Sequence, residues 1–227
     1  MRRNASVPSA WQRRLLEKLP VHKYSLTLII ILLAHIALVG LEREHFLLLG
    51  PLLTLALYFL GFLLLQDRSR ISRAMLAIGC GALALSLVNM LVGGSYCLAA
   101  ALTGHAVFLI LLVIFLFGHL LAEKRVTLDQ VMAGIIIYLI IAGLWTQFYA
   151  LTLLVNPDAL HIAGGLGECP FLTMYYFSVT TLTTAGFGDI IPVSDLARIL
   201  AAYESLVGQV YLVVFIALLM GRHFASK

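Results

Sequence analysis

Charged residues are scarce in this sequence, and so are cysteines. Only 11 % of the 227 residues are charged, against roughly a quarter in an average soluble domain, while 62 % are hydrophobic and the mean hydropathy is +1.02. Three cysteines are too few for a disulfide framework. No Ser/His/Asp cluster, phosphate-binding loop or metal-ligand spacing occurs in a segment that could be aqueous. The composition indicates an integral membrane protein and argues against an enzyme, and we expect no cofactor.

Apolar segments fill most of the chain. A span needs about 20 apolar residues, and residues 74–118, which lack Asp, Glu, Lys and Arg, fit two helices joined at Gly93-Gly94. Thr127 and Asp129 are candidate caps of the following helix. Residues 171–182 are apolar but too short to cross, which favours a re-entrant helix. We predict an all-α protein with six spans, at about 24–41, 46–65, two within 74–118, 131–155 and 195–221.

The placement of charges sets the predicted orientation. With the N-terminus inside, thirteen Lys/Arg residues fall on the inner side and only Arg43 and Arg198 on the outer side, which is the positive-inside pattern and leaves no patch for nucleic acid. Acidic residues lean outward, where they would concentrate cations. They are Glu42, Glu44, Asp158, Glu168, Asp189, Asp195 and Glu204. Cys169 in the predicted outer loop leaves an intersubunit disulfide open.

Residues 175–192, YYFSVTTLTTAGFGDIIP, carry the most informative pattern. They combine a short apolar stretch with hydroxyl residues, two glycines and a carboxylate. Non-helical backbone at membrane depth is tolerated only where protein or a water-filled path satisfies its polar groups. Carbonyl oxygens that replace the hydration shell of an ion need left-handed or alternating dihedral angles, which Gly186 and Gly188 adopt without steric cost. The pattern predicts an ion selectivity filter between the fifth and sixth helices.

This stretch resembles the filter of the potassium channel superfamily, and the resemblance covers about residues 127–222. It implies that the filter, Thr184 to Gly188, binds K+ through Thr184, Ala185, Gly186 and Phe187. It also implies supporting roles for Thr183, Asp189, Tyr175, Tyr176, Phe177 and Thr180. Gly208, 22 residues after Gly186, falls where the family carries its inner-helix hinge, although a packing glycine is equally compatible. Since one chain has one pore loop and the family uses four, the resemblance implies a homotetramer.

Three positions depart from the usual pattern of the family. A branched aliphatic residue is common where Ala185 stands, and tyrosine is commoner than phenylalanine at Phe187. Both changes keep the backbone carbonyls, which are the ligands, but alanine packs less tightly. Thr180 stands where some members place a carboxylate that pairs with the Asp189 position, so that pairing is missing here.

The predicted fourth helix lacks the arginines of a voltage sensor. No Arg or Lys occurs between Cys97 and Gly118, and one charge crossing the field is worth about 2.3 kcal/mol per 100 mV. The resemblance is therefore to a bacterial six-helix member without gating charges. The expected organisation is a basic interfacial segment or disordered tail (1–23), a four-helix scaffold (24–120), a cytoplasmic linker (121–130), a pore domain (131–222) and a short cytoplasmic tail (223–227).

These observations predict a potassium-selective channel without strong voltage gating. Alternatives are a non-selective monovalent cation channel, if Ala185 loosens the filter, and a membrane sensor or assembly subunit that does not conduct. Expected partners are three further copies and membrane lipids. The tail after Arg222 is too short to form a soluble ligand-binding domain. The expected location is a prokaryotic plasma membrane, with both termini cytoplasmic.

Overall fold

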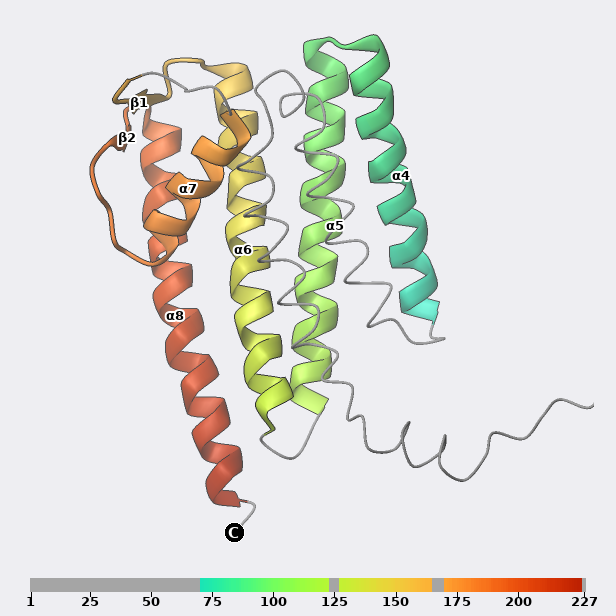
Figure 1. The fold of residues 1–227 in the computed structure, drawn as a ribbon, viewed down its shortest axis with the longest axis vertical. Coiled ribbons are helices and arrows are strands. Elements are labelled where there is room, and N and C mark those ends of the chain that lie inside the picture. The colour runs from blue at the N-terminus through green and yellow to red at the C-terminus, as the bar shows by residue number, and fades with distance from the viewer. Residues whose placement is uncertain (1–69, 123–126, 165–169, 226–227) are drawn as a thin grey trace, which may run out of the picture.

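The computed structural model describes residues 70–122, 127–164 and 170–225. The elements of this part are α4 (Arg70–Val92), α5 (Ser95–Ala122), α6 (Leu128–Val155), β1 (Leu160–Ile162), α7 (Pro170–Leu182), β2 (Ile190–Pro192) and α8 (Asp195–Ala225) (Figure 1). The predicted segment 1–23, the first two predicted spans and Cys169 lie outside the described residues.

Four of the described helices are long and apolar enough to cross a membrane. These stretches are Arg73–Val92, Ser95–Ala122, Gln130–Val155 and Asp195–Arg222. Gly93 and Gly94 lie between the first two, at φ +70° and +97°, so both have the left-handed backbone that glycine adopts most easily. The predicted turn between two spans is therefore confirmed, and the chain is that of a helical membrane protein.

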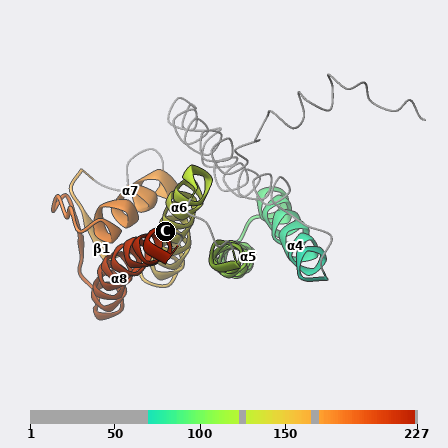
Figure 2. The same ribbon diagram turned by 90° about the horizontal axis from the view of Figure 1, so that it is seen from below.

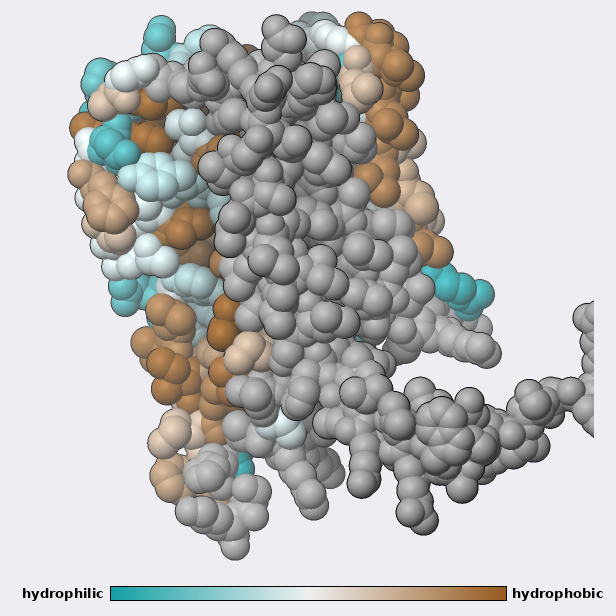
Figure 3. All heavy atoms as spheres, viewed as in Figure 1, coloured by the Kyte–Doolittle hydropathy of each residue, from teal (hydrophilic) through white to brown (hydrophobic). Residues whose placement is uncertain are grey.

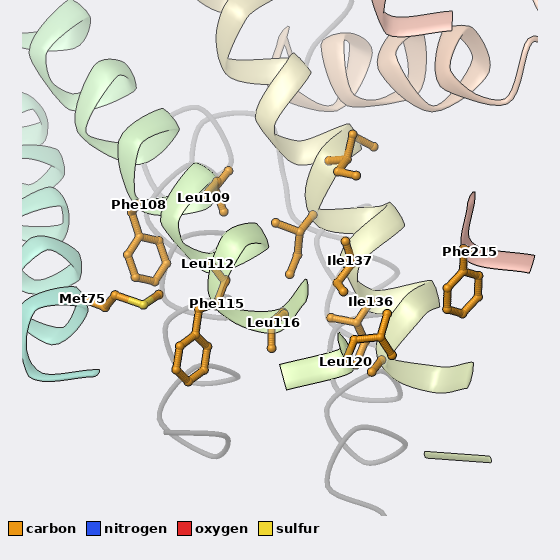
Figure 4. Close-up of a cluster of buried hydrophobic side chains, with 14 of the residues drawn as sticks. Met75, Phe108, Leu109, Leu112, Phe115, Leu116, Leu120, Ile136, Ile137 and Phe215 are labelled. Atoms are coloured by element: carbon orange, nitrogen blue, oxygen red, sulfur yellow. The ribbon is translucent and has the colours of Figure 1, made fainter. Parts of the chain in front are cut away.

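The four long helices pack in chain order. Seen from below, α5 lies between α4 and the group formed by α6, α7 and α8 (Figure 2). Figure 4 shows how the core joins them: Phe108 of α5 lies beside Met75 of α4, and Leu116 points toward Ile136 of α6. All four side chains are at most 2 % exposed. Because α4 reaches α6 through α5, the two halves of the described chain share one apolar core.

Thr127 starts α6 with a capping box. The Thr127 side chain accepts a hydrogen bond from the backbone N–H of Gln130, and the Gln130 side chain accepts one from the backbone N–H of Thr127. Each side chain thus satisfies a backbone donor that the first turn of the helix leaves free. Of the two predicted caps, Thr127 is confirmed.

Three residues of α8 attach its lower part to the neighbouring helices. Gly134 of α6 makes room for the Phe215 ring, because a Cβ atom at Gly134 would lie 2.0 Å from the Phe215 Cζ. The Tyr211 hydroxyl donates to the Gly134 carbonyl at 2.7 Å. Arg222 donates from both terminal nitrogens to the carbonyls of Leu120 and Leu121 in the last turn of α5, at 2.6 and 2.7 Å. The end of α8 is therefore attached to both α6 and α5.

Much of the outer surface of these helices is apolar. Figure 3 shows hydrophobic residues along α4 and along the lower part of α8. Leu91 on α4 is 81 % exposed and Val213 on α8 is 65 % exposed in the single chain. Such surfaces are unfavourable in water, so they require lipid or a protein partner.

Candidate functional site

The site is organised around α7, which is too short to cross a membrane. Its 13 residues extend about 20 Å at 1.5 Å per residue, whereas the hydrocarbon core is about 30 Å thick. α7 packs against α6 and α8 and lies beside their upper halves (Figure 1). Met174 and Phe177 anchor it in an apolar cluster with Tyr149 of α6 and Ala197 of α8.

The loop after α7, residues 183–189, contains the predicted filter, Thr184 to Gly188, and we call this loop the candidate filter. Its first amides turn back to the end of α7. Thr183 N–H donates to Val179 O at 3.0 Å, and Ala185 N–H donates to Thr180 O at 2.8 Å. These bonds satisfy carbonyls that a helix end otherwise leaves free. The loop is therefore fixed to the carbonyl end of α7 by its own N–H groups.

The backbone of the candidate filter alternates in handedness. Thr184, Gly186 and Gly188 have φ values of 58°, 50° and 81°, while Ala185 and Phe187 are not at positive φ. The two glycines thus have the left-handed conformation expected from the sequence. Thr184 is the only residue other than glycine with positive φ in the described part of the chain, and for a β-branched residue this conformation is a genuine outlier.

Four carbonyl oxygens of the candidate filter have no hydrogen-bond donor within the described residues. Among the described residues, no donor bonds the carbonyls of Thr184, Ala185, Gly186 or Phe187, and all four residues are exposed. With the N–H groups of Thr184 to Gly186 directed to α7, these oxygens are available to water or to a cation. Oxygen ligands of this kind suit hard monovalent ions.

Side chains from α6 and α8 bind the last two carbonyls of α7. The Tyr138 hydroxyl of α6 donates to Leu182 O at 3.0 Å, and the Ser205 hydroxyl of α8 lies 3.2 Å from Thr181 O. Neither contact could be predicted from the sequence, since both join segments distant in the chain. They hold the end of α7 between the two long helices.

Gly208 lies where α8 comes closest to α7. It is buried, and a Cβ atom there would lie 2.1 Å from the Leu182 carbonyl oxygen and 3.0 Å from the carbonyl carbon. The atoms in the way are backbone, which cannot swing aside like a side chain. The structure thus gives Gly208 a packing role, whereas the hinge role implied by the resemblance stays a prediction.

Tyr176 supports the outer end of the candidate filter. Its hydroxyl donates to Asp189 Oδ2 at 2.8 Å, and its ring stacks on Phe187 with centroids 6.3 Å apart. The hydrogen bond to Asp189 raises the pKa of Tyr176 above its ordinary value, so the phenol keeps its proton and donates. Tyr176 thus gives Asp189 the partner that Thr180 does not provide, because the Thr180 hydroxyl bonds Phe177 O in its own helix.

The other predicted supporting residues make contacts with α7, α6 or the main core. Tyr175 packs against the main core, and Phe177 meets Tyr149 edge to face at 4.8 Å. Thr183 donates from its hydroxyl to Val179 O at 2.7 Å. Of the three aromatic residues, Tyr176 is therefore the one with a ring contact or hydrogen bond to the candidate filter within the described chain.

A small sheet joins the segment after α6 to the segment after the candidate filter, and the sequence did not predict it. β1 pairs antiparallel with β2, with Leu160 opposite Pro192 and Ile162 opposite Ile190. Ala163 N–H donates to Asp189 O at 2.9 Å, and Arg198 Nε donates to Pro192 O at 3.3 Å. The segment after α6 is thereby joined to the segment that leads into α8.

Gln209 reaches the inner end of the candidate filter. Its Nε2 donates to the Thr184 hydroxyl at 3.2 Å. The side chain is exposed in the single chain, as is Thr184. Sequence reasoning missed this residue, although a polar side chain one position after Gly208 in an apolar span was a usable signal.

Glu204 is not part of an acidic outer mouth, and that expectation is wrong. Its side chain is 0 % exposed and lies between α6, α7 and α8. It contacts the hydroxyls of Tyr149 and Ser178, each at 2.5 Å. Sequence position gives depth along a helix but not its face, which is why the burial was missed. Asp158, Asp189 and Asp195 are exposed.

Comparison with known proteins supports an ion channel. Residues 131–223 match a family model described as ion channel. This match supports an ion channel superfamily for the part of the chain that holds α7 and the candidate filter, and it suggests a protein that is not an enzyme. Neither the curated proteins nor the solved structures gave a match. Within the described residues, no group of three or more His, Cys, Asp or Glu side chains is placed to hold a metal ion.

Proposed function

We propose that this chain is one subunit of a homotetrameric, potassium-selective channel. The observation that carries the proposal is the candidate filter, in which positive φ at alternate residues accompanies four free carbonyl oxygens. Alternating handedness turns successive carbonyls toward the same side of a strand, so four copies around an axis would surround a path with oxygen rings. Such rings replace the hydration shell of K+.

Thr184 supports this reading because its conformation is costly. A non-glycine residue at positive φ costs about 1–3 kcal/mol and persists where the surroundings enforce it. Here the Thr184 N–H bonds Thr181 O and its hydroxyl accepts from Gln209. Strain maintained in this way fits a residue whose carbonyl and hydroxyl are both needed at the inner ion site.

In this proposal α7 is a re-entrant pore helix. It cannot span the bilayer, and its carbonyl end meets the candidate filter. A helix C-terminus carries a partial negative charge, which favours a cation on the path. Residues 131–222 would then form the pore domain, and the six-span topology with both termini inside the plasma membrane completes the arrangement.

The tetramer accounts for the exposed surface of the candidate filter and α8. One chain supplies one strand of carbonyls, and a closed ring needs further copies. Tyr203, Leu206 and Val210 of α8 are each more than half exposed in the single chain. Neighbouring copies and lipid would cover them. K+ is the permeant ion, and no other cofactor is expected.

Purified protein in liposomes tests the proposal. We expect K+ flux that Ba²⁺ blocks and a reversal potential that follows K+ rather than Na+. Gly186→Asp should abolish the flux, because it adds a side chain and a charge where φ is +50°. Gly164→Asp is the matched control: Gly164 also has positive φ and open space around it, but it lies in the loop after β1.

Other results of this experiment would each favour a different function. A reversal potential that ignores the K+ to Na+ ratio would make it a non-selective cation channel. Absence of flux from well-folded tetramers would favour a membrane sensor or assembly subunit. Steep voltage activation would contradict the expected scaffold role of the first four helices.

A further inference from the structure

Glu204 is a buried acid with two short contacts and no cation beside it. Its Oε2 accepts from the Tyr149 hydroxyl of α6, and its Oε1 lies 2.5 Å from Ser178 Oγ of α7. All three side chains are 0 % exposed. Among the described residues no salt bridge to Glu204 occurs. A carboxylate in this setting would be a buried charge without a counterion, which is strongly unfavourable inside a membrane.

The hydrogens of this cluster can be counted. Ser178 Oγ lies 2.8 Å from the Ala142 carbonyl of α6 as well as 2.5 Å from Glu204 Oε1. A hydroxyl has one hydrogen, and a carbonyl has none to give, so the Ser178 hydrogen must lie in the contact with Ala142. The contact with Glu204 then needs a hydrogen from the carboxyl group. Tyr149 supplies the one to Oε2.

We infer that Glu204 is a proton-binding residue within the membrane and that its proton positions α7 behind the candidate filter. The hydrogen-bond chain runs from Glu204 Oε1–H to Ser178 Oγ and from Ser178 Oγ–H to Ala142 O. It links α8, α7 and α6 through groups that are all satisfied. Ser178 lies five residues before Thr183, where the candidate filter begins. Part of this inference, the effect on conduction, rests on the proposed function.

Loss of the Glu204 proton would break this hydrogen-bond chain between Ser178 and Ala142. The single hydrogen of Ser178 would turn toward the carboxylate, and Ser178 Oγ and Ala142 O would face each other 2.8 Å apart with no hydrogen between them. Ala142 O also accepts from the Thr146 hydroxyl, so it keeps one hydrogen bond when Ser178 no longer donates to it. α7 would lose this hydrogen bond to α6 and keep the one from Tyr138 to Leu182 O. Alkaline conditions should therefore weaken the support of the candidate filter.

Other titratable groups on the packed elements are accounted for. On α6, Tyr149 donates to Glu204 and Tyr138 lies within electrostatic range of it. On α7, Tyr176 bonds Asp189 instead, and Tyr175 packs against the main core. His161 of β1 and the first-turn residues Asp195 and Arg198 of α8 are exposed. Glu204→Gln leaves all of these groups unchanged, so its differences from the wild type report on Glu204.

Glu204→Gln is the decisive variant. A glutamine amide has the shape of the protonated acid, with an N–H to donate to Ser178 and an oxygen to accept from Tyr149. We expect it to fold and conduct like the wild type at neutral pH. Its flux should stay constant as the pH rises, whereas wild-type flux should fall. If a carboxylate is needed instead, Glu204→Gln would lose flux or stability at neutral pH, and the inference would be overturned.

Infrared spectroscopy tests the proton without relying on conduction. The wild type at neutral pH should show the carbonyl stretch of a protonated carboxylic acid, and Glu204→Gln should lose it. Asp195→Asn, which removes an exposed carboxyl from the same helix, is the matched control and should keep it. Wild type and Glu204→Gln with the same spectrum in this region would refute the protonated acid. If the wild type shows this carbonyl band but no K+ flux, the proton site would stand and the proposed channel function would be refuted.

Discussion

Replacing Gly208 with alanine should separate α8 from the end of α7. The added Cβ would lie 2.1 Å from the Leu182 carbonyl oxygen, whereas ordinary contact begins at 3.4 Å, so the two must part by 1.3 Å (3.4 minus 2.1). Overpacking of this kind costs about 1–3 kcal/mol. The gain in helix propensity from glycine to alanine returns about 1 kcal/mol. We therefore expect a net loss of up to about 2 kcal/mol per subunit from these two terms.

The shift should also reach the candidate filter. Ser205 and Gln209 lie on either side of Gly208 on α8. The Ser205 hydroxyl lies 3.2 Å from Thr181 O and 3.0 Å from Ala201 O, and Gln209 donates to the Thr184 hydroxyl. A displacement of about 1 Å lengthens bonds of 3.2 Å beyond useful range. We expect weaker K+ flux and a reversal potential shifted toward that of Na+.

Gly221→Ala is the matched control for this experiment. Gly221 lies in the same helix, and a Cβ atom there has no neighbour within 4 Å. It should gain helix propensity without any clash, so the difference in melting temperature between the two variants isolates the contact with Leu182. Equal melting temperatures and unchanged selectivity would refute the packing role of Gly208. Equal melting temperatures with altered opening would favour the hinge role.

Three further substitutions test separate contacts. Tyr176→Phe keeps the aromatic ring but removes the hydrogen bond to Asp189 Oδ2, and should alter the reversal potential with a smaller change in melting temperature than Gly208→Ala; unchanged permeation would contradict a supporting role. Gly134→Ala should destabilise the protein by about 1–3 kcal/mol because its Cβ meets the ring of Phe215, and adding Phe215→Leu should restore the melting temperature; no rescue would place the strain elsewhere. Arg222→Gln should lower stability by about 1 kcal/mol by releasing the last-turn carbonyls of α5, with partial recovery in Arg222→Lys; identical melting curves would show that this contact is idle.

Local signals predicted the helix ends and the loop conformation. The Gly93-Gly94 turn and the Thr127 cap depend on residues adjacent in the chain, and both are found where the sequence indicated. The positive φ of Gly186 and Gly188 was likewise expected, because an alternating backbone has few other solutions. Short-range chemistry therefore predicted this part of the fold correctly.

Contacts between segments distant in the chain could not be predicted from the sequence. The pairing of β1 with β2 joins two three-residue strands, which are too short to show an alternating pattern. The burial of Glu204 depends on three helices meeting at one point. The general expectation that an ionisable residue within a membrane helix is functional was a usable warning, and it applied to Glu204. The positive φ of Thr184 had no signal at all, since threonine disfavours it.

The alternating backbone of the candidate filter also bears on how such a segment can diverge. Ala185 and Phe187, the two filter residues that differ from the commoner potassium-channel pattern, are the ones that do not lie at positive φ. At these positions any L-amino acid fits the backbone, so mutation can exchange side chains while the carbonyls stay in place. At positions 186 and 188 the same drift would be selected against, because a side chain there strains the main chain. Among relatives of this chain, residue identity should thus vary at positions 185 and 187 and stay glycine at positions 186 and 188.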